Sequence, residues 1–292
     1  MVGKEREAGG SELINRYRWY EKVGIYLGIA VFLTFILAPF FEAFLVSLRP
    51  WRKIISIPYE VITEGMSFDA YFSVWQNVPL LWLYIWNSFF IATCVTLLTL
   101  TAVIPAAWAF ARFEFWGSRA LLTSFLAVNM VGGAVLVIPL FKIMMNLGML
   151  NTYWALIMPG TAFLIPIGIW LLRAYLMRIP RELEEAAWAD GASRLYILWR
   201  VIIPIAMPGL VVVTIATFIG AYSQQFIIAI SFNSSQYLHP LAVGLYLQSG
   251  GSLSAWNEVM AASIIGVLPV MIIFFFLQRH MIDGLTAGAV KA

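Results

Sequence analysis

Long apolar stretches alternate with short polar segments along most of this chain. A helix needs about 20 mostly apolar residues to cross the roughly 30 Å hydrocarbon core of a bilayer. Six stretches meet that requirement, at residues 23–47, 80–108, 121–145, 153–173, 205–231 and 260–278. The pattern therefore predicts an all-α integral membrane protein with six transmembrane helices, in which residues 1–292 form a single transmembrane domain.

Composition excludes a soluble protein. Of the 292 residues, 62% are hydrophobic and 11% are charged, whereas soluble domains average about 45–50% apolar and about 25% charged residues. The mean hydropathy is +0.86. This number of charged residues is too small to cover the surface of a soluble protein of this size. The apolar stretches are therefore interpreted as membrane spans rather than as buried core helices.

The lysines and arginines predict how the spans are oriented. With the N-terminus inside, 14 of the 18 basic residues lie on the cytoplasmic side, and only Arg49, Arg52 and Lys53 lie in outer loops. Lys142 lies near the outer end of the third span. Because cytoplasmic loops carry the excess of basic residues in membrane proteins, we expect a multi-pass protein with both termini cytoplasmic. The net charge of +3 is explained by this placement, and no nucleic-acid partner is expected.

The residues that most enzymes need are missing. The single cysteine, Cys94, and the two histidines, His239 and His280, share no metal-ligand spacing. No catalytic or phosphate-binding motif occurs, so we expect no enzymatic activity, no catalytic residue and no metal site. Glu42 is the only acidic residue within a predicted span. It either pairs with Lys142 or, as we favour, extends to the interface; any energy input must come from elsewhere.

The inner loop of residues 174–204 predicts two short helices joined at a glycine. Pro180 suits a first helical position, Gly191 can adopt the left-handed conformation that ends a helix, and Ser193 can cap the next helix. Acidic residues in the first turns complement the helix dipole; they are Glu182, Glu184 and Glu185. We call residues 181–200 the elbow, and we expect it to lie outside the membrane.

The elbow and the residues after it carry a known signature. The segment begins with Glu185-Ala186-Ala187, which is followed after three residues by Gly191 and after nine more by Val201-Ile202-Ile203-Pro204. This spacing resembles the E-A-A-x₃-G-x₉-I-x-L-P pattern of the permease subunits of binding-protein-dependent ABC importers. Val201 and Ile203 are mild apolar departures from that pattern. Asp190-Gly191-Ala192 resembles the variant of the carbohydrate-uptake branch, and residues 25–292 are most similar to the maltose-type second permease subunit.

This resemblance implies a role for the elbow and a set of partners. In the family the elbow docks on a cytoplasmic ATPase, and the coupling residues implied here are Glu184, Glu185, Ala186, Ala187, Asp190, Gly191, Ala192 and Pro204. The implied partners are a second related permease, two ATPase subunits that bind ATP and Mg, an extracytoplasmic solute-binding protein, and the lipid of a prokaryotic cytoplasmic (inner) membrane. No cofactor is expected in this chain. The alternative, an amphipathic helix on the inner leaflet, is disfavoured by the three glutamates.

The fifth span departs from the family pattern. Sugar permeases often carry Trp-Asn-Asp/Glu-Phe here, where this chain has Tyr222-Ser223-Gln224-Gln225-Phe226. Consecutive residues in a helix are rotated by about 100°, so these polar groups cannot all face the same neighbour. They either hold helices together or line a solute pathway. The candidate pathway residues are Asn87, Tyr222, Ser223, Gln224 and Gln225.

The outer loop of residues 232–259 contains a flexible segment. In the resembled family this loop reaches the docked binding protein; the alternative is a plain connection between spans. The candidate contact residues are Ser249, Gly250, Gly251 and Ser252.

Together these features predict a permease subunit that passes a carbohydrate or related polar solute by alternating access, driven by separate ATPase subunits. An amino-acid-type permease, a secondary transporter and a membrane scaffold remain alternatives. The solute, the subunit that contacts it and the identity of the two permeases in the dimer stay open.

Overall fold

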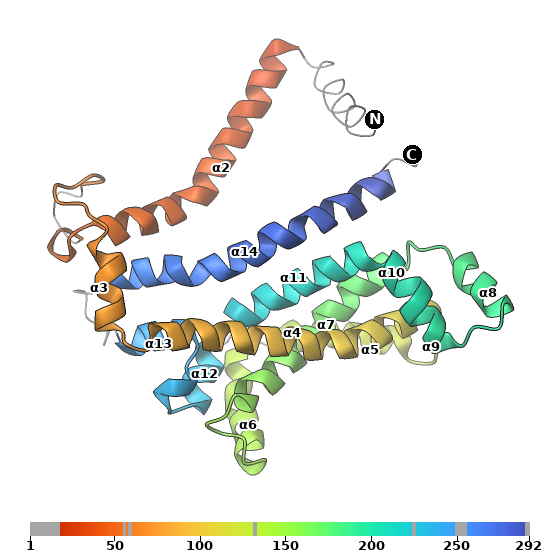
Figure 1. The fold of residues 1–292 in the computed structure, drawn as a ribbon. Coiled ribbons are helices and arrows are strands. Elements are labelled where there is room, and N and C mark those ends of the chain that lie inside the picture. Colours follow the sequence, from red (N-terminus) through yellow and green to blue (C-terminus); the bar gives the residue numbers. More distant parts are fainter. Residues whose placement is uncertain are drawn as a thin grey trace. The chain divides into compact units, whose positions relative to one another are not determined.

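A computed structural model describes residues 18–54, 57, 60–130, 133–223, 226–248 and 256–289, and these residues form helices joined by turns and irregular segments (Figure 1). The all-α prediction is confirmed. By length and composition, four described helices can cross a membrane: α2 (Trp19–Leu48), α4 (Leu81–Arg112), α7 (Trp154–Leu176) and the Trp256–Gln278 part of α14 (Trp256–Ala289). A bent pair, Arg194–Ile205 with Met207–Ser223, supplies a fifth span if it crosses as one unit.

Two of the six predicted spans are each described as two shorter helices. The 121–145 stretch contains α5 (Ser118–Met130) and α6 (Gly133–Asn146), and the 205–231 stretch contains α11 (Met207–Ser223) and α12 (Phe226–Phe232). Their connecting residues, 131–132 and 224–225, lie outside the described part of the chain. In Figure 1, α6 runs in a different direction from α5. The count of six spans therefore stays a prediction.

The chain divides into two compact units, residues 1–73 with 252–261 and residues 74–251 with 262–292. In the first unit, α2 exposes nearly all of its apolar side chains and is followed by the short helix η1 (Trp51–Lys53). Arg49, which is 2% exposed, pairs with Glu42 at 3.2 Å and donates to the carbonyl oxygen of Val61 at 2.8 Å. Glu42 thus has a basic partner seven residues further along its own chain.

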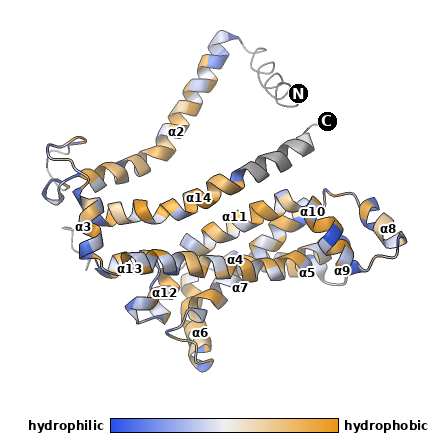
Figure 2. Ribbon diagram, in the orientation of Figure 1, coloured by the Kyte–Doolittle hydropathy of each residue, from blue (hydrophilic) through white to orange (hydrophobic). Residues whose placement is uncertain are grey.

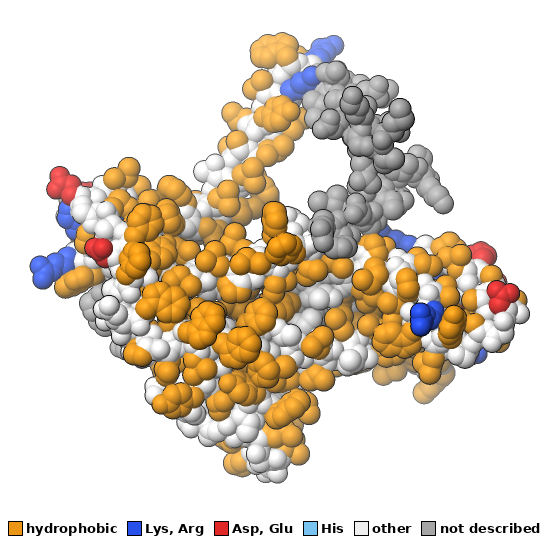
Figure 3. All heavy atoms as spheres, in the orientation of Figure 1, with side chains coloured by type: hydrophobic (Ala, Val, Ile, Leu, Met, Phe, Trp, Pro, Cys, Tyr) orange, Lys and Arg blue, Asp and Glu red, His pale blue; other side chains and the backbone are white. Residues whose placement is uncertain are grey.

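The core of the second unit is built by α4, α7 and α11. Small and apolar side chains of these helices interlock, and Gly168 of α7 lies so close to Val103 of α4 that a β-carbon there would be 2.8 Å from its methyl group. Figure 2 shows that hydrophobic residues run along most of the long helices. On the face drawn in Figure 3, hydrophobic side chains predominate and charged side chains are few. This surface suits lipid and apolar partners.

Segments expected on the outer side of the membrane contact one another. The turn of residues 146–152 has positive φ at Gly148 (66°) and Asn151 (57°), as a tight hairpin requires. The Asn151 Oδ1 atom accepts hydrogen bonds from the backbone N–H of Ser234 (2.7 Å) and from its hydroxyl group (2.9 Å). The predicted loop 232–259 also contains two helices, η3 (Gln236–Leu238) and α13 (Leu241–Gln248). Two outer loops of the prediction therefore meet at one end of this unit.

Candidate functional site

The elbow consists of two helices joined at a glycine, as predicted. In the first, α8 (Glu182–Ala189), Arg181 occupies the N-cap position without a side-chain cap hydrogen bond, so Pro180 precedes the N-cap instead of standing at the first helical position. Gly191 has φ of +84°, and the N–H group of Ala192 donates to the Ala187 carbonyl oxygen at 3.1 Å. The left-handed Gly191 and this local hydrogen bond together end α8 and turn the chain.

The second elbow helix leads into the next predicted span. Ser193 caps α9 (Arg194–Tyr196) by accepting a hydrogen bond from the N–H of Tyr196 at 3.3 Å, as predicted. Regular structure then runs through the π-helical turn η2 (Ile197–Ile202) into α10 (Ile203–Ile205), which contains Pro204. Between Arg194–Ile205 and α11 the axis bends by 82°. The elbow is therefore joined to a predicted span through one sharp bend.

The outward surface of the elbow mixes acidic, small and aromatic residues. Glu185, Ala186 and Asp190 are exposed, whereas Ala187 and Ala192 are partly buried. Large apolar side chains are also exposed; they are Leu183, Trp188, Leu195 and Tyr196. Aromatic side chains of this kind are enriched at protein interfaces, so the surface is suited to docking a protein.

The inward surface of the elbow is tied to the end of α4. Arg112 Nε donates to Glu184 Oε1 at 2.6 Å, and Trp108 Nε1 donates to the other carboxylate oxygen at 3.4 Å. Arg112 also donates to the carbonyl oxygen of Ile179 at 3.0 Å. The guanidinium group of Arg194 lies 5.0 Å from the ring centroid of Phe113. Both elbow helices are thus attached to residues 108–113.

Sequence reasoning missed these tethers. It treated Arg112 only as one of the basic residues that orient the spans, and it grouped Glu184 with Glu185 as a coupling residue. The position of Arg112 at the end of a span was visible in the sequence, but nothing there indicates which of three neighbouring glutamates it meets.

Asn87, a predicted pathway residue, is fully buried and forms three hydrogen bonds. Its Nδ2 atom donates to the carbonyl oxygens of Tyr237 (2.9 Å) and His239 (3.0 Å), and its Oδ1 atom accepts from the Tyr153 hydroxyl group at 2.8 Å. This side chain joins α4 to α7 and to the 232–240 segment, and in this structure it is fully occupied by protein partners.

The other pathway candidates lie at the end of α11. The Tyr222 hydroxyl group donates to the Gly266 carbonyl oxygen at 2.5 Å, and the exposed Ser223 hydroxyl group donates to the Ile219 carbonyl oxygen at 2.8 Å. Gln224 and Gln225 lie outside the described residues, as do the four loop candidates, Ser249, Gly250, Gly251 and Ser252.

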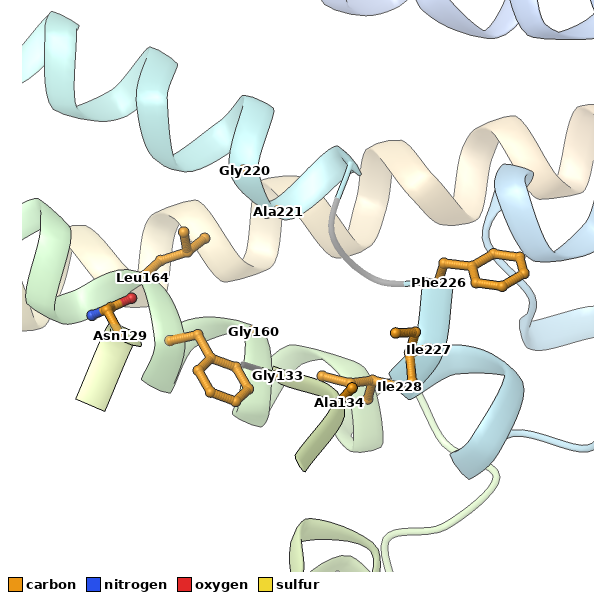
Figure 4. A pocket seen from close by; sticks show the side chains of 11 residues that line it. Asn129, Gly133, Ala134, Gly160, Leu164, Gly220, Ala221, Phe226, Ile227 and Ile228 are labelled. Carbon is orange, nitrogen blue, oxygen red and sulfur yellow. The ribbon is translucent and has the colours of Figure 1, made fainter. Parts of the chain in front are cut away.

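A cavity of about 480 Å³ lies next to the end of α11. Figure 4 shows Gly220 and Ala221 of α11, Ile228 of α12 and Leu164 of α7 around it, with Asn129 at the end of α5. The lining is mostly apolar, and small residues from α7, α11 and the start of α6 contribute to it: Gly160, Gly220, Ala221, Gly133 and Ala134. Glycine and alanine have little or no side chain, so these positions leave space for the cavity.

Within the described residues, no group of three or more histidine, cysteine, aspartate or glutamate side chains is placed to hold a metal ion. The function is therefore argued from the elbow and from the cavity.

Comparisons with known proteins match this chain to one family and to several of its permease members. A profile of the family described as "Binding-protein-dependent transport system inner membrane component" matches residues 102–286. The inner membrane ABC transporter permease protein YcjP of Escherichia coli is 33% identical over 275 residues, covering 94% of this chain and 98% of that protein. The trehalose/maltose transport system permease protein MalG of Thermococcus litoralis is 38% identical over 210 residues, covering 71% and 75%.

A solved structure agrees with these relatives. A chain of a bacterial ABC transporter involved in the import of the acidic polysaccharide alginate superposes with a TM-score of 0.68 at 25% identity, over 90% of this chain and 98% of that one. A chain of the methionine transporter MetNI, at 20% identity and a TM-score of 0.55, shares the fold.

Proposed function

The chain belongs to the family of binding-protein-dependent transport system inner membrane components, and from this premise we propose that it forms one transmembrane permease subunit of an ATP-driven importer. The observation that carries the proposal is the elbow: two helices that are joined at a left-handed glycine, expose a docking surface and lead directly into a bent span. Transport proceeds by alternating access, in which movement of the docked elbow changes which side of the membrane the spans open to.

The solute is a carbohydrate or a related polar compound. The relatives support this class, since their names state transport of trehalose and maltose, of sulfoquinovosyl glycerol and of alginate. The Asp190-Gly191-Ala192 variant favours the same branch over amino-acid permeases. The methionine transporter is similar only in fold, at 20% identity, so it does not favour an amino-acid substrate.

Hydrolysis of ATP takes place in separate subunits. The elbow exposes Glu185, Ala186 and Asp190 to an ATPase partner that binds ATP and Mg, and Gly191, Ala192 and Pro204 shape the turn and the entry into the span. The complete importer contains a second related permease, two ATPase subunits and an extracytoplasmic solute-binding protein, which residues 249–252 contact. It lies in the cytoplasmic membrane with both termini of this chain inside.

The solute pathway passes the cavity between α7, α11 and α12. Tyr222 and Ser223 follow Gly220 and Ala221, which line that cavity, and Gln224 and Gln225 come next in the sequence, so we assign these four residues to the pathway. Gln224→Leu and Gln225→Leu separate this role from helix–helix contact. A pathway role lowers solute uptake with the permease dimer intact, whereas a structural role loosens the dimer on purification.

The test is reconstitution of the chain with its partner permease, ATPase subunits and binding protein in proteoliposomes. ATP-dependent uptake is measured for a panel of sugars, sugar acids, polyols and amino acids. We expect uptake of one carbohydrate class, and none from a matched complex whose ATPase subunits cannot hydrolyse ATP. Uptake that persists in the matched complex and follows an ion gradient would show a secondary transporter instead.

A further inference from the structure

Two neighbouring glutamates of α8 have different surroundings. Glu185 is exposed, whereas the Glu184 side chain is 14% exposed and meets the Arg112 side chain, which is 6% exposed. Adjacent residues of a helix point about 100° apart, so one faces outward and the other faces its own chain. Docking on a partner protein is open to Glu185, but Glu184 is already engaged inside this subunit.

The Glu184–Arg112 contact has the features of a strong and oriented pair. At 2.6 Å it is a charge-assisted hydrogen bond. The second bond of Arg112, to the Ile179 carbonyl oxygen at 3.0 Å, holds the guanidinium group in place, and Trp108 approaches the other carboxylate oxygen. Breaking one side of a largely buried pair leaves the other charge unpaired.

A second contact attaches the other elbow helix to the same place. Arg194 of α9 lies over the ring of Phe113 at 5.0 Å and over the ring of Trp188 at 6.0 Å, both within range of a cation–π interaction. The residue after α4 thus holds α9, while Arg112, its last residue, holds α8.

The helix that receives these contacts extends through the unit. α4 has 32 residues, which corresponds to about 48 Å at 1.5 Å per residue. Near its other end Asn87 is bonded to Tyr237 and His239, in the loop expected on the outer side. Figure 1 shows α4 reaching from the region of α13 to the region of α9.

We propose that Glu184 and Arg112 are positioning residues that make the elbow and α4 move as one body, so that displacement of the docked elbow is delivered along α4 to the outer end of the subunit. The proposal rests on the function proposed above. It assigns Glu184 to transmission within this chain and leaves contact with the ATPase to the exposed residues Glu185, Ala186 and Asp190.

The test compares Glu184→Gln with the matched control Glu182→Gln, an exposed glutamate on the same helix, in the reconstituted complex. Solute uptake and ATP hydrolysis are measured together. For Glu184→Gln we expect the solute delivered per ATP to fall about fivefold or more, as for the loss of an ordinary coupling between two sites, while the ATPase subunits still co-purify. Glu182→Gln keeps the wild-type ratio. The exchange variant Arg112→Glu with Glu184→Arg restores part of the loss.

Equal ratios for Glu184→Gln, Glu182→Gln and wild type would overturn the proposal, and so would loss of the ATPase subunits from Glu184→Gln in proportion to its loss of uptake. If Glu184→Gln prevents the chain from pairing with its partner permease, the variant Arg112→Lys is tested instead, because it keeps the positive charge but not the two-pronged geometry of the guanidinium group. A wild-type ratio of solute delivered per ATP for Arg112→Lys then contradicts the proposal. Failure of the wild-type complex to transport with ATP contradicts the proposed function itself, whereas wild-type transport with unaffected variants contradicts only the positioning role.

Discussion

Gly191 shows how one residue controls the direction of the elbow. Its φ is +84°, and a β-carbon at this position would meet nothing within 4 Å. The only cost of a side chain is therefore backbone strain, about 1–2 kcal/mol for a residue forced into the left-handed region. We expect Gly191→Val to redirect α9 relative to α8 and to abolish ATP-dependent uptake, measured in proteoliposomes, with partial loss of co-purifying ATPase subunits.

The chain offers a matched control for this substitution. Gly117, between α4 and α5, has φ of +85° and equally open surroundings, so Gly117→Val introduces the same strain away from the α8–α9 turn. It should retain most of the uptake, as should Gly191→Asn, since asparagine tolerates the left-handed conformation. Wild-type uptake by Gly191→Val would show that the turn does not direct coupling.

Asn87 is the residue at which a structural role and a pathway role separate most clearly. Asn87→Leu removes three hydrogen bonds from a site that is 0% exposed, each worth roughly 0.6–2 kcal/mol in a membrane protein. We expect the purified complex to unfold at a lower temperature, as measured by thermal denaturation. A complex of unchanged thermal stability but altered solute uptake would instead support the pathway role.

At the scale of elements, close helix contacts depend on glycines. A β-carbon on Gly244 of α13 would lie 2.3 Å from a ring carbon of Tyr84 in α4, and that ring is 2% exposed. The ring has no free space to move into, so Gly244→Ala should cost about 1–3 kcal/mol as overpacking does elsewhere. The expected readout is a lower unfolding temperature. Gly28→Ala in α2, where nothing lies within 4 Å, serves as the control, and equal stability of the two variants would contradict this packing.

At the scale of the whole molecule, the charge pattern predicts which segments share a side of the membrane. Segments expected inside the cell, residues 108–113 and 179–194, bind one another, and segments expected outside, near residues 151 and 234, bind one another. We expect alkaline phosphatase fused at either terminus to be inactive and the same enzyme inserted after Gly148 to be active, measured in whole cells. An active terminal fusion would refute cytoplasmic termini.

Much of this protein was determined by local properties of its sequence. Apolar length predicts helices that cross a bilayer, because unpaired backbone groups are too costly in hydrocarbon. The α8 end at Gly191 and the cap at Ser193 depend only on residues within one turn, so they were predictable and the structure confirms them. The family signature lies in this same local segment.

Tertiary structure decided the partners of individual polar side chains and the different directions of α5 and α6 (Figure 1). Hydropathy reports the length of an apolar stretch and not the direction of a helix, so the different directions of α5 and α6 in Figure 1 could not be predicted from it. Glu184 and Glu185 are alike in sequence, and Asn87 resembles any polar residue in a span. Their roles differ because folding brings Arg112 to one carboxylate, leaves its neighbour exposed, and surrounds Asn87 with two carbonyl groups and a hydroxyl group. Hydrogen bonds and ion pairs act over a few ångströms in space, and only the packed helices determine which residues, 66 to 152 positions apart for these bonds, come that close.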